Sequence, residues 1–184
     1  MALAVREVLL RDTHECKTDP DAKLSRKSAG GAFQLCHMGH VLMENRNGLP
    51  VEARVTEATT AAEWEAALSK LRATTKGRGA TVGADTGYDC SQFVTGSRAL
   101  GITPHVARHT KRASHIDKRT TRHDGYQVSL KKRKQIEQIF GWLKTTRPSR
   151  KCLGTPKNCS YFSNGNTARQ ITYLFSTVFS LPTF

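Results

Sequence analysis

The chain has 184 residues, of which 38 % are hydrophobic and 7 % aromatic, which allows one ordinary domain with a buried core and a tail. Its 29 Lys and Arg against 15 Asp and Glu give a formal net charge of +14. The five cysteines share no Cys-x-x-Cys spacing, no run reaches the roughly 18 apolar residues of a membrane span, and the apolar start is too short for a signal peptide. These features argue against a disulfide framework and against a membrane protein, and we expect a cytoplasmic location.

The first predicted elements form a β-hairpin. Residues 33–43 are strand-like, residues 51–55 alternate apolar and polar side chains, and Asn45-Arg46-Asn47-Gly48 between them is a turn. Because Asn-Gly between two such runs is a strong hairpin signal, we expect two antiparallel strands here.

A helix is predicted after the hairpin. Thr60 and Glu63 have the spacing of a capping box, in which each side chain bonds to the backbone of the other residue. Trp64, Leu68 and Leu71 then recur at helical spacing and form one apolar stripe.

Two short strands with a weak helix between them follow. Residues 80–84 are a buried type of strand that ends at Asp85, and residues 90–100 are a weak helix. Residues 102–107 are another strand, in which Pro104 favours an edge position or a bulge. The order of elements so far indicates a mixed α/β domain.

The rest of the chain divides into a basic part and a tail. Residues 108–128 are predicted to form a long basic loop and residues 129–146 a helix. From residue 147 the composition turns to Ser, Thr and Asn, and the final apolar run, 171–181, is compatible with a strand, a helix or disorder.

The positive charge is concentrated rather than spread. Residues 108–151 contain 14 Lys and Arg and three acids, which is +11 of the total of +14. Such a concentration is typical of a polyanion-binding surface, so nucleic acid is the leading partner. An anionic membrane is second, but no amphipathic helix combines a broad apolar face with a basic back.

The last predicted helix carries one carboxylate among cations. Arg133, Glu137 and Lys144 share a narrow stripe beside an apolar one. In one interpretation Arg133 and Glu137 form an ordinary exposed pair four residues apart, worth a few tenths of a kcal/mol. In the other, Glu137 is a metal ligand beside a phosphate backbone. The apolar stripe consists of Ile136, Ile139, Phe140 and Leu143.

A second candidate carboxylate lies at the end of a strand. Asp85 follows residues 80–84, and functional sites gather at the carboxyl ends of strands in α/β sheets. The alternative is a helix cap, a role for which Asp89 is better placed. Together, Asp85 and Glu137 offer two carboxylates from separate elements to a divalent ion such as Mg²⁺.

A zinc site is a weaker candidate. Cys36, His37 and His40 invite a zinc interpretation, but on a strand His37 faces away from the other two, and no second ligand pair has metal-site spacing.

Several short motifs between residues 13 and 145 support the metal interpretation of Asp85 and Glu137. They are Thr18-Asp19-Pro20-Asp21-Ala22-Lys23-Leu24, Met38-Gly39-His40, Met43-Glu44-Asn45-Arg46-Asn47-Gly48-Leu49, Gly83-Ala84-Asp85 with Gly87-Tyr88-Asp89, and Pro104-His105-Val106-Ala107. In these motifs the chain resembles the catalytic region of bacterial insertion-sequence transposases of the DDE type. The family pattern of Tyr, two residues, Arg, three residues, Glu, six residues and Lys is matched by Arg133, Glu137 and Lys144, with Leu130 at the Tyr position.

The resemblance implies a ribonuclease-H-like α/β fold, a mixed sheet with flanking helices. It implies Asp85 as the second and Glu137 as the third catalytic acid, Mg²⁺ or Mn²⁺ as the metal they hold, and Arg133 and Lys144 as contacts to the transposon ends. DNA, as transposon ends and target, would be the partner, the protein would be nucleoid-associated, and a homodimer is the assembly to test for in the intact enzyme. The other candidate DNA contacts are the cations of the basic segment: Arg108, Lys111, Arg112, Lys131, Lys132 and Lys134.

Departures from the family pattern suggest a remnant. The family's first acid lies upstream of the motif at residues 18–24, and Asp12 is the only imitation of it, too close to that motif to fit. We therefore expect residues 1–146 to be the C-terminal portion of the catalytic core, incomplete at its N-terminus. Residues 147–184 would be a divergent tail, disordered or produced by a frameshift. Two alternatives stay open, a non-catalytic basic nucleic-acid-binding remnant and a chain with no stable fold.

Overall fold

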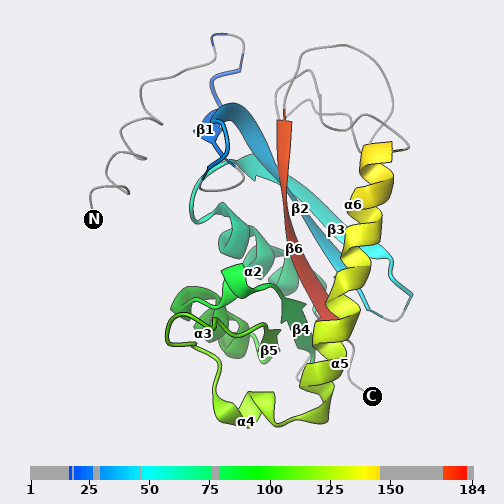
Figure 1. Cartoon of the computed structure of the whole chain (residues 1–184). Helices are drawn as coiled ribbons and strands as arrows, with labels where there is room; N and C mark the ends of the chain where they lie inside the picture. The colour runs from blue at the N-terminus through cyan, green and yellow to red at the C-terminus, as the bar shows by residue number, and fades with distance from the viewer. Residues whose placement is uncertain are drawn as a thin grey trace. The chain divides into compact units, whose positions relative to one another are not determined.

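The structure is a computed structural model that describes residues 17, 19–26, 30–45, 47–75, 79–145 and 172–181 (Figure 1). Helices and strands alternate along the chain, which confirms the prediction of a mixed α/β protein. The elements are β1 (Lys23–Ser25), β2 (Gln34–Glu44), β3 (Pro50–Glu57), α2 (Ala62–Thr74), β4 (Thr81–Ala84), η1 (Thr86–Tyr88), α3 (Ser91–Ala99), β5 (Thr103–Val106), α4 (Lys118–Thr121), α5 (Asp124–Lys132), η2 (Arg133–Gln135), α6 (Ile136–Thr145) and β6 (Thr172–Leu181).

The chain divides into two compact units. The first comprises Met1–Gly39, Val55–Ala62 and Trp142–Phe175, and the second comprises His40–Arg54, Glu63–Gly141 and Ser176–Phe184. Among the described residues, no helix has the length and apolar character needed to cross a membrane. The expected boundary between a core and a tail at residue 146 stays a prediction.

The predicted hairpin is confirmed. β2 and β3 pair with each other, and the backbone N–H of Glu44 donates to the carbonyl of Leu49 at 2.9 Å to close the turn. Gly48 has a φ of 71°, a left-handed conformation that glycine adopts without steric cost. On the other end of β2, β1 pairs antiparallel with it, with Leu24 opposite Leu35.

β4 is the strand around which the second unit is organised. It pairs in parallel with β5, with Ala84 opposite Val106, and α3 makes the crossover between the two strands. On its other side it pairs antiparallel with β6, with Ala84 opposite Val178 (Figure 1). The strand order is β1-β2-β6-β4-β5, so Pro104 lies in an edge strand, as its residue type predicts. Residues 172–181 of the final apolar run are thus a strand.

The core of the second unit lies between the sheet and helices α2, α3 and α5. Val82 and Leu71 are fully buried there, and Trp64 and Leu68 pack against them, which confirms the apolar stripe predicted for α2. Gly96 weakens α3 as an isolated helix, but a Cβ at this position would lie 2.6 Å from Leu68 Cδ1. The glycine therefore allows α2 and α3 to approach closely.

The basic part of the chain is more helical than its sequence predicts. Residues 108–128 were expected to be a loop, but α4 begins at Lys118 and α5 at Asp124. The helix expected at 129–146 is interrupted by the short 3₁₀ turn η2. Asp117 explains the start of α4, because its side chain accepts a hydrogen bond from the backbone N–H of Thr120 at 2.7 Å.

One lysine is buried in the second unit. Lys70 on α2 is 1 % exposed, and burial lowers its pKa to about 7. His40 is buried nearby, and burial together with the charges of Lys70 and Arg54 lowers its pKa to about 3. His40 is therefore neutral at physiological pH, while Lys70 is only partly protonated.

The buried Lys70 predicts a stability that rises with pH. Between pH 7 and about 10.5 the unfolded chain binds this proton and the folded chain does not, so the free energy of unfolding increases across that window. Lys70→Met removes the buried charge, so below pH 7 we expect it to increase the free energy of unfolding by on the order of 2–5 kcal/mol. Urea denaturation at pH 6 and pH 10 measures both effects.

The exposed Lys131 supplies the control, because Lys131→Met changes the same chemical group without relieving burial. The difference in free energy of unfolding between the wild type and Lys70→Met should change between pH 6 and pH 10. A difference that stays constant would contradict the lowered pKa of Lys70.

Candidate functional site

Asp85 lies at the carboxyl end of β4, beside the end of the parallel strand β5. It is the N-cap of η1, and its Oδ1 accepts a hydrogen bond from the backbone N–H of Thr86 at 2.7 Å. Its side chain is 59 % exposed, so the carboxylate caps the turn and still faces solvent. The cap interpretation of Asp85 is therefore confirmed, and its role as a functional acid stays a prediction.

Arg133 forms an ion pair with Asp85. Its Nη1 lies 2.6 Å from Asp85 Oδ1, across 48 positions of sequence, and its side chain is 27 % exposed. The ordinary interpretation of the helix paired Arg133 with Glu137, whereas the partner in the structure is Asp85. Arg133 Nε is buried and has no hydrogen-bond acceptor among the described residues.

The surroundings of Asp85 favour its charged form. Partial burial alone would raise its pKa, but the hydrogen bond from Thr86 and the contact with Arg133 outweigh burial and hold the pKa of Asp85 below its ordinary value. Asp85 is thus a carboxylate over the whole neutral range.

Glu63 is a carboxylate near Asp85 that the sequence did not single out as functional. It lies in the first turn of α2, and a Cβ on Gly87 would lie 4.0 Å from its Oε2. Burial and the negative charge of Asp85 raise the pKa of Glu63. The sequence placed Glu63 in a capping box, and nothing in that local pattern pointed to Asp85, 22 residues further on.

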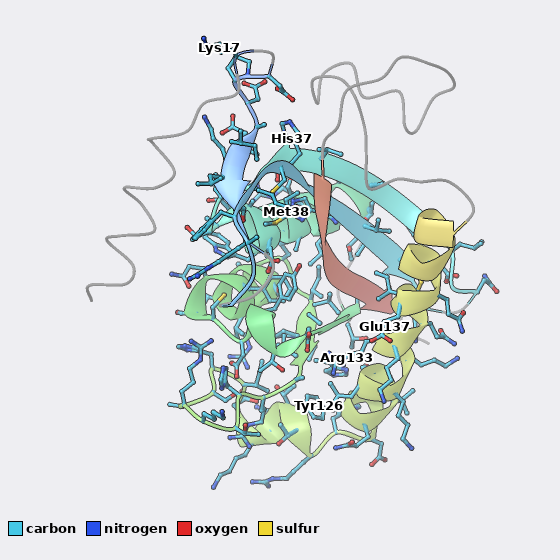
Figure 2. All side chains as sticks on the ribbon, turned by 45° about the horizontal axis from the view of Figure 1, so that its top comes forward. Lys17, His37, Met38, Tyr126, Arg133 and Glu137 are labelled. Carbon is cyan, nitrogen blue, oxygen red and sulfur yellow. The ribbon has the colours of Figure 1, made fainter. Side chains whose placement is uncertain are left out.

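Glu137 follows Arg133 by one helical turn, in the first turn of α6. Figure 2 shows Tyr126, Arg133 and Glu137 in succession along the α5, η2 and α6 segment. The Glu137 side chain is exposed, and Ile136 and Ile139 on the same helix are buried, so the predicted apolar stripe is confirmed for these two residues. The side chains of Phe140, Trp142 and Lys144 lie outside the described residues.

Asp89 has a role that the sequence did not predict. It was expected to cap the following helix, but Cys90 is the N-cap of α3 and makes no side-chain cap bond. Asp89 instead accepts the backbone N–H of His109 on Oδ2 at 2.9 Å and that of His115 on Oδ1 at 2.8 Å. Burial would raise its pKa, and these hydrogen bonds together with one from Ser114 lower it instead.

His37 is one of the three residues considered for zinc. Its Nε2 lies 2.9 Å from Asp19 Oδ2 in a buried pair, so Asp19 is the partner that the structure gives it. Within the described ranges, no group of three or more His, Cys, Asp or Glu side chains could hold a metal ion. Cys36, His37 and His40 therefore form no such group.

A family model identifies the chain. The model of the transposase DDE domain matches residues 6–157, most of the sequence. The chain belongs to this family. The resemblance in its motifs is thereby confirmed, and membership implies a DNA substrate and the divalent metal ions that the family typically uses. Neither the curated proteins nor the solved structures contain a match to the chain.

The carboxylates of this transposase domain suit a hard divalent ion. The contacts of Asp85 with Thr86 and Arg133 both use Oδ1, which leaves Oδ2 for another ligand. Glu137 is exposed one turn from Arg133. Carboxylate oxygens are the donors that Mg²⁺ and Mn²⁺ prefer, so Asp85 and Glu137 fit such an ion by chemistry, and their role as its ligands stays a prediction.

The cations expected to contact DNA lie on the surface of the transposase domain. All six from the basic segment are exposed, which is the condition for reaching a phosphate backbone. They are Arg108, Lys111 and Arg112 in the loop after β5, and Lys131, Lys132 and Lys134 in α5 and η2. Their contact with DNA stays a prediction.

Arg133→Ala is expected to raise the pKa of Asp85 toward its ordinary value of 3.8, because it removes a hydrogen bond and a positive charge from beside the carboxylate. A carboxyl group whose pKa is lower in the folded than in the unfolded protein stabilises the fold at pH values above the unfolded pKa. This stabilisation is lost as the pH falls through the folded pKa. Arg133→Ala should therefore lower the free energy of unfolding mainly above about pH 4. Carboxyl carbon NMR titration measures the pKa. Lys131→Ala, on the neighbouring turn, should leave it unchanged, and a shift as large in this control would contradict the role of Arg133.

Proposed function

We propose that the chain is part of the catalytic region of an insertion-sequence DNA transposase that cleaves and joins phosphodiester bonds at transposon ends. The observation that carries this proposal is the Arg133–Asp85 ion pair. It joins the acid at the end of β4 to the helical segment that bears Glu137. Glu137 lies in α6, directly after the turn η2 whose Arg133 is 2.6 Å from Asp85.

A ribonuclease-H-like fold is part of this proposal. It is supported by the antiparallel β2–β3 hairpin, by the parallel β4–β5 pair with α3 as crossover, and by Asp85 at the carboxyl end of β4. In sheets of this kind, functional groups collect where parallel strands end.

In this proposal Asp85 and Glu137 hold Mg²⁺ or Mn²⁺. Such ions, when bound, activate the attacking oxygen and stabilise the leaving oxygen of a phosphodiester. The protein's own contribution is to keep Asp85 ionised, through Thr86 and Arg133, and to leave its Oδ2 accessible.

Arg133 has a second role in the proposal. The Arg133 side chain is 27 % exposed, so it can contact a phosphate oxygen while Nη1 stays on Asp85. Lys144 and the exposed lysines of α5 would hold the neighbouring backbone.

We expect this chain alone to perform little or no strand transfer. By the resemblance to the family it supplies two of the three catalytic acids, Asp85 and Glu137. A purified protein that nicks or joins end-containing DNA in Mg²⁺, and loses this activity in Glu137→Ala, would overturn that expectation. Glu65→Ala is the matched control, because Glu65 is an exposed glutamate in the first turn of another helix.

The second candidate function is binding to nucleic acid without catalysis. It is favoured by the exposure of the basic cations, because their charge alone produces affinity for a phosphate backbone. Fluorescence anisotropy with duplex DNA separates the two proposals. The transposase proposal expects tighter binding of end-containing DNA on addition of Mn²⁺, and loss of that increase in Asp85→Ala. Binding with a steep salt dependence and no response to Mn²⁺ or to Asp85→Ala would favour the second candidate.

A further inference from the structure

Two aspartates flank the short turn η1 (Thr86–Tyr88), with Asp85 as its N-cap and Asp89 as its C-cap. Asp89 is 1 % exposed, and within the part of the chain that the structure describes it forms no ion pair with Lys or Arg. It binds backbone instead, with Oδ2 on the N–H of His109 and Oδ1 on the N–H of His115. Residues 109–115 are therefore drawn into a loop around one buried carboxylate.

The same loop is held at both ends by other contacts. The Tyr126 hydroxyl donates to the carbonyl of Val106 at 2.9 Å, and the hydroxyl also bonds to the backbone of Arg108. On the far side, Arg98 Nη2 pairs with Asp117 Oδ2 at 2.8 Å. The loop thus has a fixed stem, and Asp89 fixes its middle.

The loop presents cations to solvent. Lys111 and Arg112 lie between the two backbone donors and are exposed. Within the described part of the chain, neither enters an ion pair. The buried carboxylate of Asp89 thus binds the backbone of the loop, and the cations of the loop remain unpaired. This arrangement is suited to binding an external anion.

We propose that Asp89 is a positioning residue that holds residues 109–115 as a preformed phosphate-contacting loop, in fixed relation to Asp85. The inference rests on the proposed DNA function and adds to it the group that places these cations. A single 3₁₀ turn joins Asp85 and Asp89. A DNA strand bound by Lys111 and Arg112 would therefore be positioned relative to Asp85. Because the loop is ordered before binding, little conformational entropy is lost when DNA binds.

Asp89→Asn tests the proposal. Asparagine has one carbonyl oxygen in place of two carboxylate oxygens, so one of the two backbone N–H groups loses its acceptor and the loop loosens. We expect DNA affinity to fall roughly 5- to 30-fold, and the slope of log K against log salt to become shallower by up to about 2, the contribution of two phosphate contacts.

A double-mutant cycle separates positioning from general stability. Lys111→Ala/Arg112→Ala should weaken binding in the wild type and have much less effect in Asp89→Asn, because the cations are no longer placed. Lys131→Ala/Lys132→Ala, a matched pair of exposed lysines on α5, should weaken binding equally in both backgrounds. Equal effects of the loop pair in both backgrounds would overturn the proposal.

A milder variant covers the case in which Asp89→Asn does not fold. Ser114→Ala removes one hydrogen bond to Asp89 and the acceptor of the Ile116 backbone N–H, and it leaves both backbone bonds to Asp89 in place. We expect Ser114→Ala to lower DNA affinity two- to threefold, and its effect should again be non-additive with that of Lys111→Ala/Arg112→Ala. Additive effects on affinity would overturn the proposal. A wild-type chain that does not bind DNA at all would instead refute the proposed function.

Discussion

The ion pair between Arg133 and Asp85 connects the other candidate functional groups to one another. It joins the end of a buried strand to a helix that begins far along the chain, at 2.6 Å. From Asp85 the turn η1 leads to Asp89, Asp89 binds the loop after β5, Tyr126 binds the start of that loop, and the helix of Tyr126 continues to Arg133. These contacts close a ring. The ring is possible because β4 and β5 are parallel, which lets both chain segments leave the sheet at the same edge.

Local patterns in the sequence were sufficient for most of the framework. The Asn-Gly turn predicts the hairpin, the spacing of Trp64, Leu68 and Leu71 predicts the buried face of α2, and the apolar run before Asp85 predicts β4. The basic loop was predicted too long, although a signal for α4 was present. Asp117 has the position and residue type of an N-cap, and cationic residues do not oppose a helix. The apolar run at 171–181 has no decisive period, and its pairing with β4 depends on tertiary contacts that a single segment does not encode.

The candidate site was only partly predictable. Helical spacing shows that Arg133 and Glu137 share a stripe, but it does not show what lies opposite that stripe, so the pairing with Asp85 could not be derived. Glu63 and Asp89 were interpreted as caps because caps are the commonest local use of acids near helix starts. Their neighbours in the structure come from other elements. Burial and the charge of Asp85 raise the pKa of Glu63, whereas hydrogen bonds outweigh burial and lower the pKa of Asp89. The family match agrees with the motifs, since it covers residues 6–157.

The way in which Asp89 holds its loop has a consequence for how the protein can change over evolutionary time. Two of its partners are backbone N–H groups, which every residue except proline provides. The side chains of residues 110–113 can therefore be exchanged while the path of the chain is retained. Cations could be gained, lost or replaced by side chains that contact base edges. Asp89 would keep the backbone that carries these new side chains in the same position. A surface built in this way is free to acquire new preferences without a change in the fold that supports it.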